Sequence, residues 1–410
     1  MRFEEKLKEY AQLIVRVGLN VQPNQVCYVQ ADVTSTQLTR LVVEEAYHAG
    51  AKMVYVNYGD SIIRKLTFQR ANDEVFTTHP EWDKVMKEHL RDADACFLVI
   101  DSEDPDLLTG VPATRITNAR KTRGRALKSF DHSLDSGHNS WTVATAASAA
   151  WANKVFPNDA HAIDKLWEAI FAACRIGTGN AVHLWQKHMD NLENRVKSLN
   201  KKKYAALHYK GTGTDLIVGL HPKHVWLGSA SPHPNGYHFV PNLPAEEIFT
   251  APAKKQVNGT LTGTKPICYN GVIIDQFSFR FEDGRIVEAK AETGNDWLQS
   301  LVTTDEGTHY LGEVALVPHN SPISNTGILF YDTLFDENAA SHFALGSAYA
   351  TCIEGGSAMS REELDHHEMN DSVEHVDFMI GAANMNIDGI LPDGTREAIF
   401  RKGNWSKTLS

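Results

Sequence analysis

The chain has 410 residues, of which 42% are hydrophobic, and its formal net charge at pH 7 is −11. A chain of this length can bury large cores, and the length predicts two or three domains. The acidic balance disfavours a general binder of nucleic acid or of anionic membranes, so we expect small solutes or peptides as partners.

The opening segment of about 20 residues mixes acidic, basic and apolar side chains and does not have the pattern of a secretory signal. No stretch approaches the roughly 20 apolar residues that a membrane-spanning helix needs. The cysteines never occur in a C-x-x-C spacing, which predicts buried, reduced thiols and a cytoplasmic protein. They are Cys27, Cys96, Cys174, Cys268 and Cys352.

Residues 1 to about 150 alternate between helical periodicity and short apolar strands. After an amphipathic opening helix, strands are expected at 26–32, 53–60 and 95–104, with helices between them. Continuous apolar strands separated by helices are typical of a parallel sheet covered on both faces. We predict a Rossmann-like α/β domain here, and because no G-x-G-x-x-G follows a strand, the pattern predicts no dinucleotide site.

The rest of the chain is predicted to be helical up to about residue 205 and rich in strands beyond it. Two helical stretches between residues 151 and 205 are expected to bridge two domains. Beyond residue 205 strand and turn signals dominate, including a hairpin at Asp283-Gly284. The predicted organisation is an α/β N-terminal domain with bridging helices at 1–205, and a mixed α+β domain at 206–410.

The segment SVEHVDFMIG alternates as a strand does, so His375 and Asp377 should project from one face. An imidazole and a carboxylate placed together can bind a metal ion. The spacing also fits a buried ion pair or a core histidine with its hydrogen bonds made inside the fold.

The segment DENAASHFALGSAY predicts a helix that begins near Asp336 as its N-cap. His342 and Tyr349 are seven residues apart and would share one helical face, with Glu337 about 140° around from His342. The many small residues of this segment predict close approach by another backbone or a tight site. Glu337 has a second explanation, because a carboxylate in a first helical turn interacts favourably with the helix dipole.

Glu313 lies in the apolar run LGEVAL, where a charged side chain is costly unless it is paired or coordinated. A strand with Glu313 facing solvent explains the same run. Taken with the preceding residues, Glu313 completes a carboxylate-rich set with two imidazoles, which suits two hard or borderline divalent cations better than a structural zinc site. The expected chemistry is metal-assisted hydrolysis.

Four segments in order, NLPAEEIFTAP, YLGEVALVP, ILFYDTLFDENAASHFALGSAY and VEHVDFMIG, together with the N-terminal GLNVQPNQ, resemble the thermophilic-type metallo-aminopeptidases. This family includes aminopeptidase T, aminopeptidase S and bacterial aminopeptidase II. The matching segments extend along most of the chain. Each motif is short, and the ordered series is what makes the resemblance specific.

The resemblance implies a two-metal site and a function. The implied metal ligands are Glu247, Glu313, His342, Tyr349, His375 and Asp377. Glu246 stands beside Glu247, so either of the two could be the ligand. The resemblance also implies a homodimer, a choice of zinc, cobalt, magnesium or manganese as the divalent ions, and removal of N-terminal residues with broad preference.

The function expected from both lines of reasoning is a metal-dependent aminopeptidase that attacks peptides with a free N-terminus through a water activated by two metal ions. Glu337 is the expected proton shuttle. Tyr349 is expected either to bind a metal or to donate a hydrogen bond to the oxyanion. The alternatives are another metal-dependent amidase, or a catalytically silent protein that binds a metal or ligand on the same scaffold.

Overall fold

The computed structural model describes residues 1–228, 230–269 and 272–407. The chain divides into two compact units, and each unit contains segments that are distant in sequence. Unit 1 comprises Met1–Lys187 and Ala230–Ala245, and unit 2 comprises His188–Ser229 and Glu246–Ser410. A strand from the middle of the chain therefore belongs to the unit built mainly from the N-terminal half.

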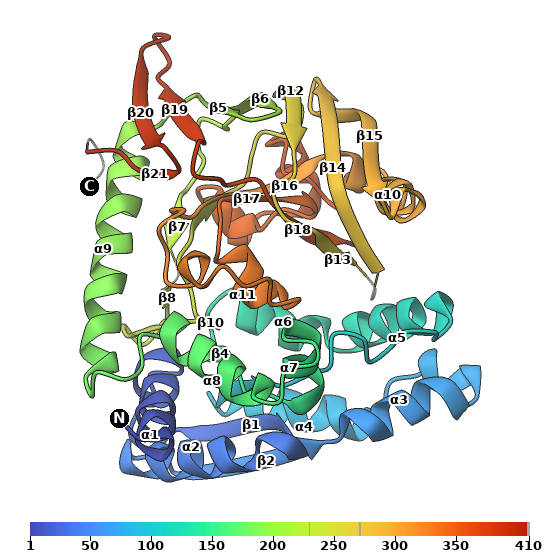
Figure 1. Cartoon of the computed structure of the whole chain (residues 1–410), viewed down its shortest axis with the longest axis vertical. Helices are drawn as coiled ribbons and strands as arrows, with labels where there is room; N and C mark the ends of the chain where they lie inside the picture. Colours follow the sequence, from blue (N-terminus) through green and yellow to red (C-terminus); the bar gives the residue numbers. More distant parts are fainter. Residues whose placement is uncertain (229, 270–271, 408–410) are drawn as a thin grey trace. The chain divides into compact units, whose positions relative to one another are not determined.

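Unit 1 contains a five-stranded sheet in the order β10-β4-β3-β1-β2, in which every neighbouring pair is parallel (Figure 1). The strands are β1 (Val26–Asp32), β2 (Met53–Gly59), β3 (Cys96–Asp101), β4 (Trp141–Thr145) and β10 (Asn242–Leu243). A short pair, β8 (Ser231–Pro232) and β9 (His238–Phe239), lies outside this sheet. The parallel sheet and the three strands expected at 26–32, 53–60 and 95–104 are confirmed.

Helices cover both faces of this sheet because successive strand residues point in opposite directions. On one face Tyr28 and Phe97 pack with Leu90 and Phe130, which come from α4 and α6. On the other face α2 packs against β1 and β2. The helices are α1 (Phe3–Leu13), α2 (Thr36–His48), α3 (Ser61–Arg70), α4 (Glu81–Asp92), α5 (Ala113–Ala126), α6 (Lys128–Asp135), α7 (Ala149–Val155) and α8 (Ala162–Ala173), and α9 (Ala181–Lys202) continues into unit 2.

Unit 2 contains two antiparallel sheets. The first has the order β18-β17-β16-β11-β7. The second follows the path β13-β14-β12-β6-β5-β19-β20-β21, with β15 pairing with β14. The strands of the first sheet are β7 (Leu227–Gly228), β11 (Ile248–Thr250), β16 (Leu311–Leu316), β17 (His342–Gly346) and β18 (His375–Met379).

The strands of the second sheet are β5 (Ala206–Gly211), β6 (Thr214–Gly219), β12 (Val257–Thr262), β13 (Ile267–Tyr269), β14 (Val272–Glu282), β15 (Arg285–Thr293), β19 (Asn386–Ile390), β20 (Arg396–Arg401) and β21 (Asn404–Trp405). The short helices of unit 2 are α10 (Asn295–Val302), α11 (Thr333–Glu337) and α12 (Arg361–His366). The turn predicted at Asp283-Gly284 joins β14 to β15, and both of its residues have positive φ, 47° and 81°.

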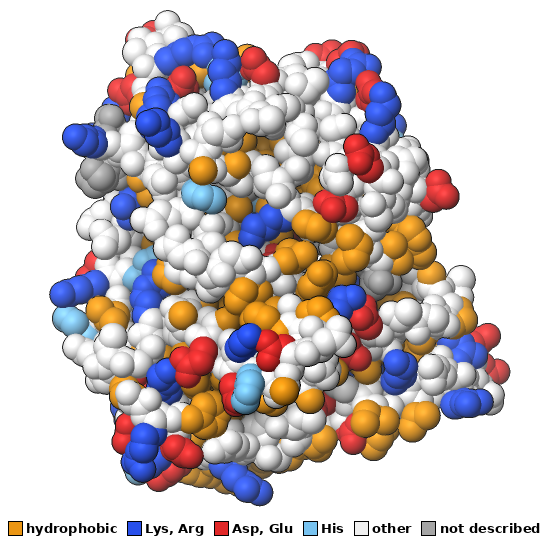
Figure 2. Space-filling view, in the orientation of Figure 1, with side chains coloured by type: hydrophobic (Ala, Val, Ile, Leu, Met, Phe, Trp, Pro, Cys, Tyr) orange, Lys and Arg blue, Asp and Glu red, His pale blue; other side chains and the backbone are white. Residues whose placement is uncertain are grey.

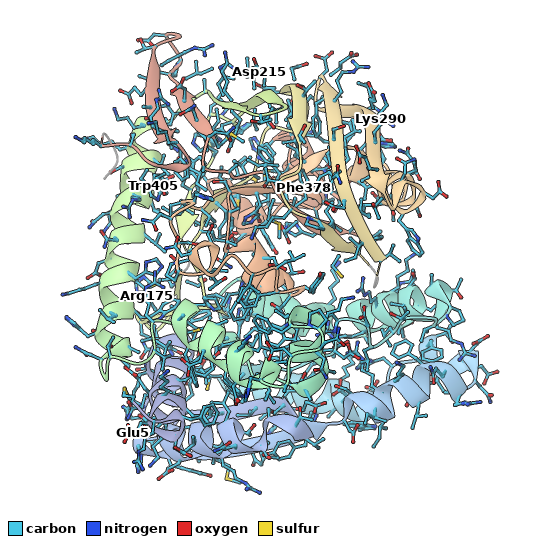
Figure 3. The ribbon with its side chains drawn as sticks, viewed as in Figure 1. Glu5, Arg175, Asp215, Lys290, Phe378 and Trp405 are labelled. Carbon is cyan, nitrogen blue, oxygen red and sulfur yellow. The ribbon has the colours of Figure 1, made fainter. Side chains whose placement is uncertain are left out.

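The two sheets of unit 2 share one apolar core. In the first sheet, Val314, Phe343 and Phe378 form a single cross-strand row that points into this core. The ring of Phe378, labelled in Figure 3, lies 5.8 Å from that of Phe277 and 5.4 Å from that of Phe279, on the second sheet. Because side chains alternate along a strand, the residues beside this row point to the opposite face of the first sheet.

One predicted element is wrong. The helix expected to begin near Asp336 instead ends there: α11 covers Thr333–Glu337 and its N-cap is Asp332, whose side chain accepts the Phe335 N–H. His342 then opens strand β17, which is buried along its whole length. The alanines of this segment favour a helix, but pairing on both sides with β16 and β18 provides hydrogen bonds and packing that override this propensity.

Two other expectations concern exposure. Four of the five cysteines are buried as predicted, whereas Cys268 is exposed. Within the residues that the structure describes, no helix combines the length and the apolar character needed to cross a lipid bilayer. On the face shown in Figure 2, positive and negative side chains are interspersed.

Candidate metal centre

The predicted site residues gather on the face of the first sheet of unit 2 that points away from the shared core. Glu313, Ala344 and Asp377 form one cross-strand row, directly beside the core row described above. His342 is two residues from Ala344 on β17, and His375 is two residues from Asp377 on β18, so both imidazoles project on the same side. Ala344, between the two carboxylates of its row, leaves room above the sheet.

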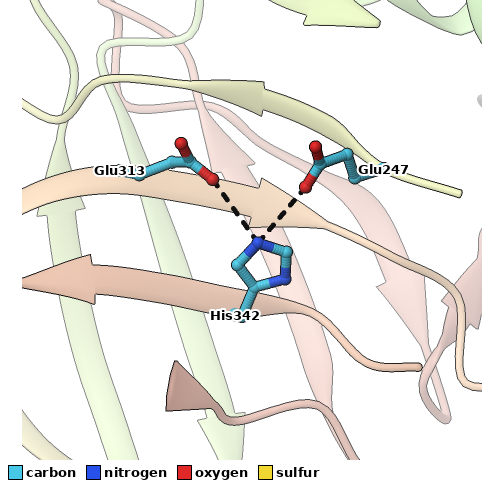
Figure 4. Close-up of side chains that lie close together, drawn as sticks. All are labelled: Glu247, Glu313 and His342. Carbon is cyan, nitrogen blue, oxygen red and sulfur yellow. Dashed lines mark ion pairs between the residues drawn. The ribbon is translucent and has the colours of Figure 1, made fainter. Parts of the chain in front are cut away.

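Glu247 joins this face from the neighbouring strand. It directly precedes Ile248, which opens β11 and points into the core, so Glu247 faces the opposite way. Nε2 of His342 lies 3.2 Å from Oε2 of Glu247 and 3.4 Å from Oε1 of Glu313 (Figure 4). These three side chains form a group whose ligand atoms are close enough to share one metal ion.

A second group lies beside the first. Nε2 of His375 is 3.7 Å from Oε2 of Glu313 and 3.4 Å from Oδ1 of Asp377. Glu313, His375 and Asp377 also meet the spacing of a common metal ion. Glu313 therefore belongs to both groups and directs one carboxylate oxygen toward each.

Both imidazoles are oriented by backbone carbonyl groups. Nδ1 of His342 donates to the carbonyl oxygen of Ala340 at 3.1 Å, and Nδ1 of His375 donates to that of Ser347 at 2.7 Å. A proton held on Nδ1 leaves the lone pair of a neutral imidazole on Nε2, which is the atom that faces the carboxylates. This tautomer is the one that metal binding through Nε2 requires.

A β-bulge at Gly312 sets the direction of Glu313. Leu311 pairs with Leu345, but Glu313 pairs with Ala344, so Gly312 is an extra residue in β16. A Cβ atom at Gly312 would lie 2.3 Å from the carbonyl oxygen of Gly346. The bulge lets Leu311 point into the core while Glu313 points to the metal-binding face.

Asn338 fixes the segment that leads to Glu247. Its buried side chain accepts the N–H of Glu246 at 2.6 Å and donates to the carbonyl of Leu334 in α11 at 2.9 Å. The carboxylate of Glu246 lies 3.4 Å from Nε2 of His188. Of the two adjacent glutamates, the structure thus places Glu247 with the cluster and Glu246 with His188. Sequence reasoning did not select Asn338 or His188, because neither has a spacing signal.

Glu337 and Tyr349 lie beside the two groups. Glu337 is the last residue of α11, and its carboxyl interacts electrostatically with Asp377, Glu247 and other members of the cluster. Tyr349 lies three residues beyond the end of β17, not on a helix with His342, and its ring centroid is 5.1 Å from that of His375. With 45% of its surface exposed, Tyr349 borders the cluster on its open side.

The carboxyl groups of the cluster are held where water solvates them poorly. Burial raises the pKa of Glu313, and burial together with the charges of Asp377 and Glu247 raises the pKa of Glu337 well above its usual range. For Asp377, burial acts in the same sense, but the neighbouring His375 outweighs it and lowers the pKa.

The neighbouring carboxylates also shift the pKa values of the two imidazoles. Burial would lower the pKa of each ring, but hydrogen bonds to Glu247 and Glu313 hold the pKa of His342 well above its ordinary value. Asp377 similarly raises the pKa of His375 to about 10. The cluster thus attracts positive charge, either as protons on the imidazoles or as bound cations.

Divalent cations fit this donor set. Four carboxyl groups meet two imidazoles here, so the donor set consists mostly of oxygen atoms and can carry several negative charges once a cation neutralises them. Burying unbalanced charge is costly, and metal coordination is one of the ways in which proteins balance it. Oxygen ligands with a minority of imidazole nitrogen, and no thiolate in either group, suit catalytic or mixed sites for several divalent metals.

A buried face of carboxylates and oriented imidazoles, open beside Tyr349, is the ligand arrangement of a metal-dependent hydrolase. The chain matches the model of the thermophilic metalloprotease family (M29) over residues 3–405, and it belongs to that family. The resemblance seen in the sequence is therefore confirmed, and the chain is a peptidase whose family implies a divalent metal cofactor.

Relatives support the same class over the full length. Aminopeptidase AmpS of Bacillus subtilis is 51% identical over 406 residues, covering 98% of this chain and 99% of the relative. Aminopeptidase 2 of Geobacillus stearothermophilus is 46% identical, with both chains covered completely. The solved structure of wild-type AmpT from Thermus thermophilus superposes with a TM-score of 0.93 at 38% identity, covering 98% of this chain and 100% of that one.

Proposed function

We propose that this protein removes single amino acids from the free N-terminus of peptides, with broad preference, and that it binds two divalent cations. Glu247, Glu313 and His342 would hold one ion, and Glu313, His375 and Asp377 the other. The observation that carries the proposal is the position of Glu313, which directs one carboxylate oxygen toward each imidazole. Tyr349 is proposed as a further ligand or as a hydrogen-bond donor on the open side.

Bound cations of this kind supply Lewis-acid polarisation of the scissile carbonyl and an acidified water. Glu337 belongs to neither ligand group but lies among the same charged side chains. It is the residue that accepts a proton from the attacking water and passes it to the leaving amine. The phenol of Tyr349 is the candidate donor to the negative oxygen that develops on the carbonyl.

Recognition of a free N-terminus follows from the same charges. A protonated or metal-liganding α-amine is attracted to the cluster of carboxylates, whereas an acetylated amine is neutral and bulkier. We propose zinc, cobalt, magnesium or manganese as the ions.

The homodimer and the cytoplasmic location, which rest on the resemblance and on the sequence, are part of this proposal, and the proposed domains remain 1–205 and 206–410.

The test is metal-dependent release of free amino acid. Protein treated with chelator and then reconstituted with each of the four metals is assayed with a panel of dipeptides and aminoacyl-p-nitroanilides, and with N-acetylated versions of the same substrates. We expect release from the free amines, loss of release with chelator, and none from the acetylated forms. Cleavage of the acetylated forms would indicate a different amidase, and no cleavage across the panel would indicate a silent binding protein.

Elemental analysis of the reconstituted protein gives an independent measure. Two equivalents of metal per chain are expected. Binding of a single equivalent at saturation would contradict the proposal that Glu313 is shared between two ions.

A further inference from the structure

Lys265 lies in the loop between β12 and β13 of unit 2. The loop is attached to the end of β18, because Thr264 donates its N–H to the carbonyl of Met379 at 2.9 Å and its hydroxyl to the carbonyl of Gly381 at 3.0 Å. Met379 is the cross-strand partner of His342. The backbone on which Lys265 stands is thus fixed beside the first group of ligands.

The ammonium group of Lys265 is near α11 as well. Its charge interacts with that of Asp336, which immediately precedes Glu337 in that helix. The carboxylate of Asp336 is already engaged by the backbone, since it accepts the N–H of Phe330 at 2.9 Å and that of Asp332 at 3.3 Å. Lys265 therefore stands on a loop attached to the end of β18, and its charge is felt by Asp336 in the helix that ends in the proposed proton shuttle.

Lys265 is a half-buried cation. Among the residues that the structure describes, none forms a hydrogen bond with its ammonium group, and no carboxylate oxygen lies within 4.0 Å of it. Burial lowers the pKa of Lys265, and Asp336 only partly compensates. A half-buried ammonium group without a close counter-ion is suited to an anion that arrives with the ligand.

We propose that Lys265 binds a carboxylate of the peptide substrate on the far side of the scissile bond. This inference rests on the proposed aminopeptidase function and adds a determinant of specificity to it. The cluster of carboxylates attracts the substrate amine but repels a substrate carboxylate, so a short peptide with both groups needs a local positive charge. The carboxylate could be the C-terminus of a dipeptide or an acidic side chain after the bond.

The experiment compares substrates with and without a carboxylate beyond the scissile bond. Values of kcat/KM are measured for Leu-Gly, Leu-Gly amide and Leu-Asp amide with metal-loaded wild type, Lys265→Met, Lys265→Arg and Lys255→Met. Lys255 is an exposed lysine of the same unit and serves as the matched control. The ratio of kcat/KM for Leu-Gly to that for Leu-Gly amide isolates the effect of the C-terminal carboxylate, and the ratio for Leu-Asp amide to Leu-Gly amide isolates that of the side chain.

In Lys265→Met at least one of these ratios should fall about tenfold or more, mainly through KM, because a charge-assisted hydrogen bond is lost. Lys265→Arg should restore much of that ratio, and Lys255→Met should leave both ratios at the wild-type value. The ratio that falls identifies which carboxylate is bound. Equal losses on all three substrates, or no loss on any, would overturn the inference while leaving aminopeptidase activity intact. A wild type that cleaves none of them would overturn the proposed function, and this inference with it.

Discussion

Glu337 differs from the other carboxylates of the cluster in its surroundings. It ends α11, it belongs to neither ligand group, and its pKa is raised by burial and by the charges of Asp377 and Glu247. A carboxyl group with these properties can exchange a proton without releasing a metal ion. Its role can therefore be separated experimentally from metal binding.

Replacing Glu337 with glutamine keeps the shape of the side chain and removes its ability to exchange a proton. Turnover of a dipeptide should fall by at least about 100-fold, while the metal content measured by elemental analysis stays at the wild-type value. Glu362→Gln, a change at an exposed glutamate of α12, should leave turnover unchanged. Near-normal turnover in Glu337→Gln would remove this residue from the mechanism.

Some contributions of single residues could be predicted from the sequence and others could not. Strict alternation in SVEHVDFMIG placed His375 and Asp377 on one face, and the structure agrees, since both project beside Glu313. The support from Asn338 depends on a contact with Glu246, which is 92 residues away in the chain. A local pattern contains no information about such a contact.

At the scale of the elements, the shape of β16 controls the direction of Glu313, which is common to both candidate ligand groups. Without the bulge, the alternation of β16 would continue unbroken, and Leu311 and Glu313 would point to the same face. The position of Gly312 therefore determines whether the carboxylate reaches the metal-binding face. A Cβ atom on Gly312 would lie 2.3 Å from the carbonyl oxygen of Gly346 and 2.4 Å from that of Ser347, so the bulge has no space for a side chain.

Gly312→Ala should destabilise the protein by about 1–3 kcal/mol, because the new methyl group forces backbone atoms apart. It should also weaken metal binding, since Glu313 is the next residue. Chemical denaturation and metal titration measure the two effects. Gly124→Ala in α5, where a Cβ atom meets nothing within 4 Å, is the matched control and should be neutral or slightly stabilising. An alanine at 312 that changed neither quantity would show that the bulge can move without cost.

The error at β17 shows where local reasoning fails. The segment DENAASHFALGSAY contains several alanines and an N-cap signal at Asp336, which together favour a helix. In the structure the same small residues serve a strand: Ala344 leaves room between two ligands, and Gly346, with φ of 102°, approaches the backbone of Glu374. The strands of the N-terminal unit were predicted because continuous apolar runs between helices have few alternative explanations.

At the scale of the whole molecule, the charges of the metal centre couple folding to pH. In the metal-free chain the pKa of His375 is about 10, because Asp377 outweighs the effect of burial, against roughly 6.5 for a histidine in an unfolded chain. The contribution of this ring to stability is fully present below about pH 6.5 and is lost as the pH rises through about 10. The pKa values of Glu313, Glu337 and His342 are also raised, so loss of their protons likewise lowers the stability of the folded chain as the pH rises.

We therefore expect the Tm of chelator-treated protein to fall between about pH 6.5 and about pH 10, measured at constant ionic strength. Asp377, whose pKa is lowered, contributes stability that is lost only at acidic pH and does not alter this window. In metal-loaded protein the cations replace the protons, so the decline should be shallower. The metal-free variant His375→Gln should also show a shallower decline. A metal-free Tm that stays level or rises over this range would contradict the expectation.

The ligands come from strands that leave the ribosome at different times. Glu247, Glu313 and His342 are all present once β17 has been synthesised, whereas His375 and Asp377 belong to β18, at the end of the strand order β18-β17-β16-β11-β7. A nascent chain can therefore complete one ligand group before it can complete the other. A polypeptide that stops before residue 375 would retain the donors of only one of the two candidate groups, that of Glu247, Glu313 and His342.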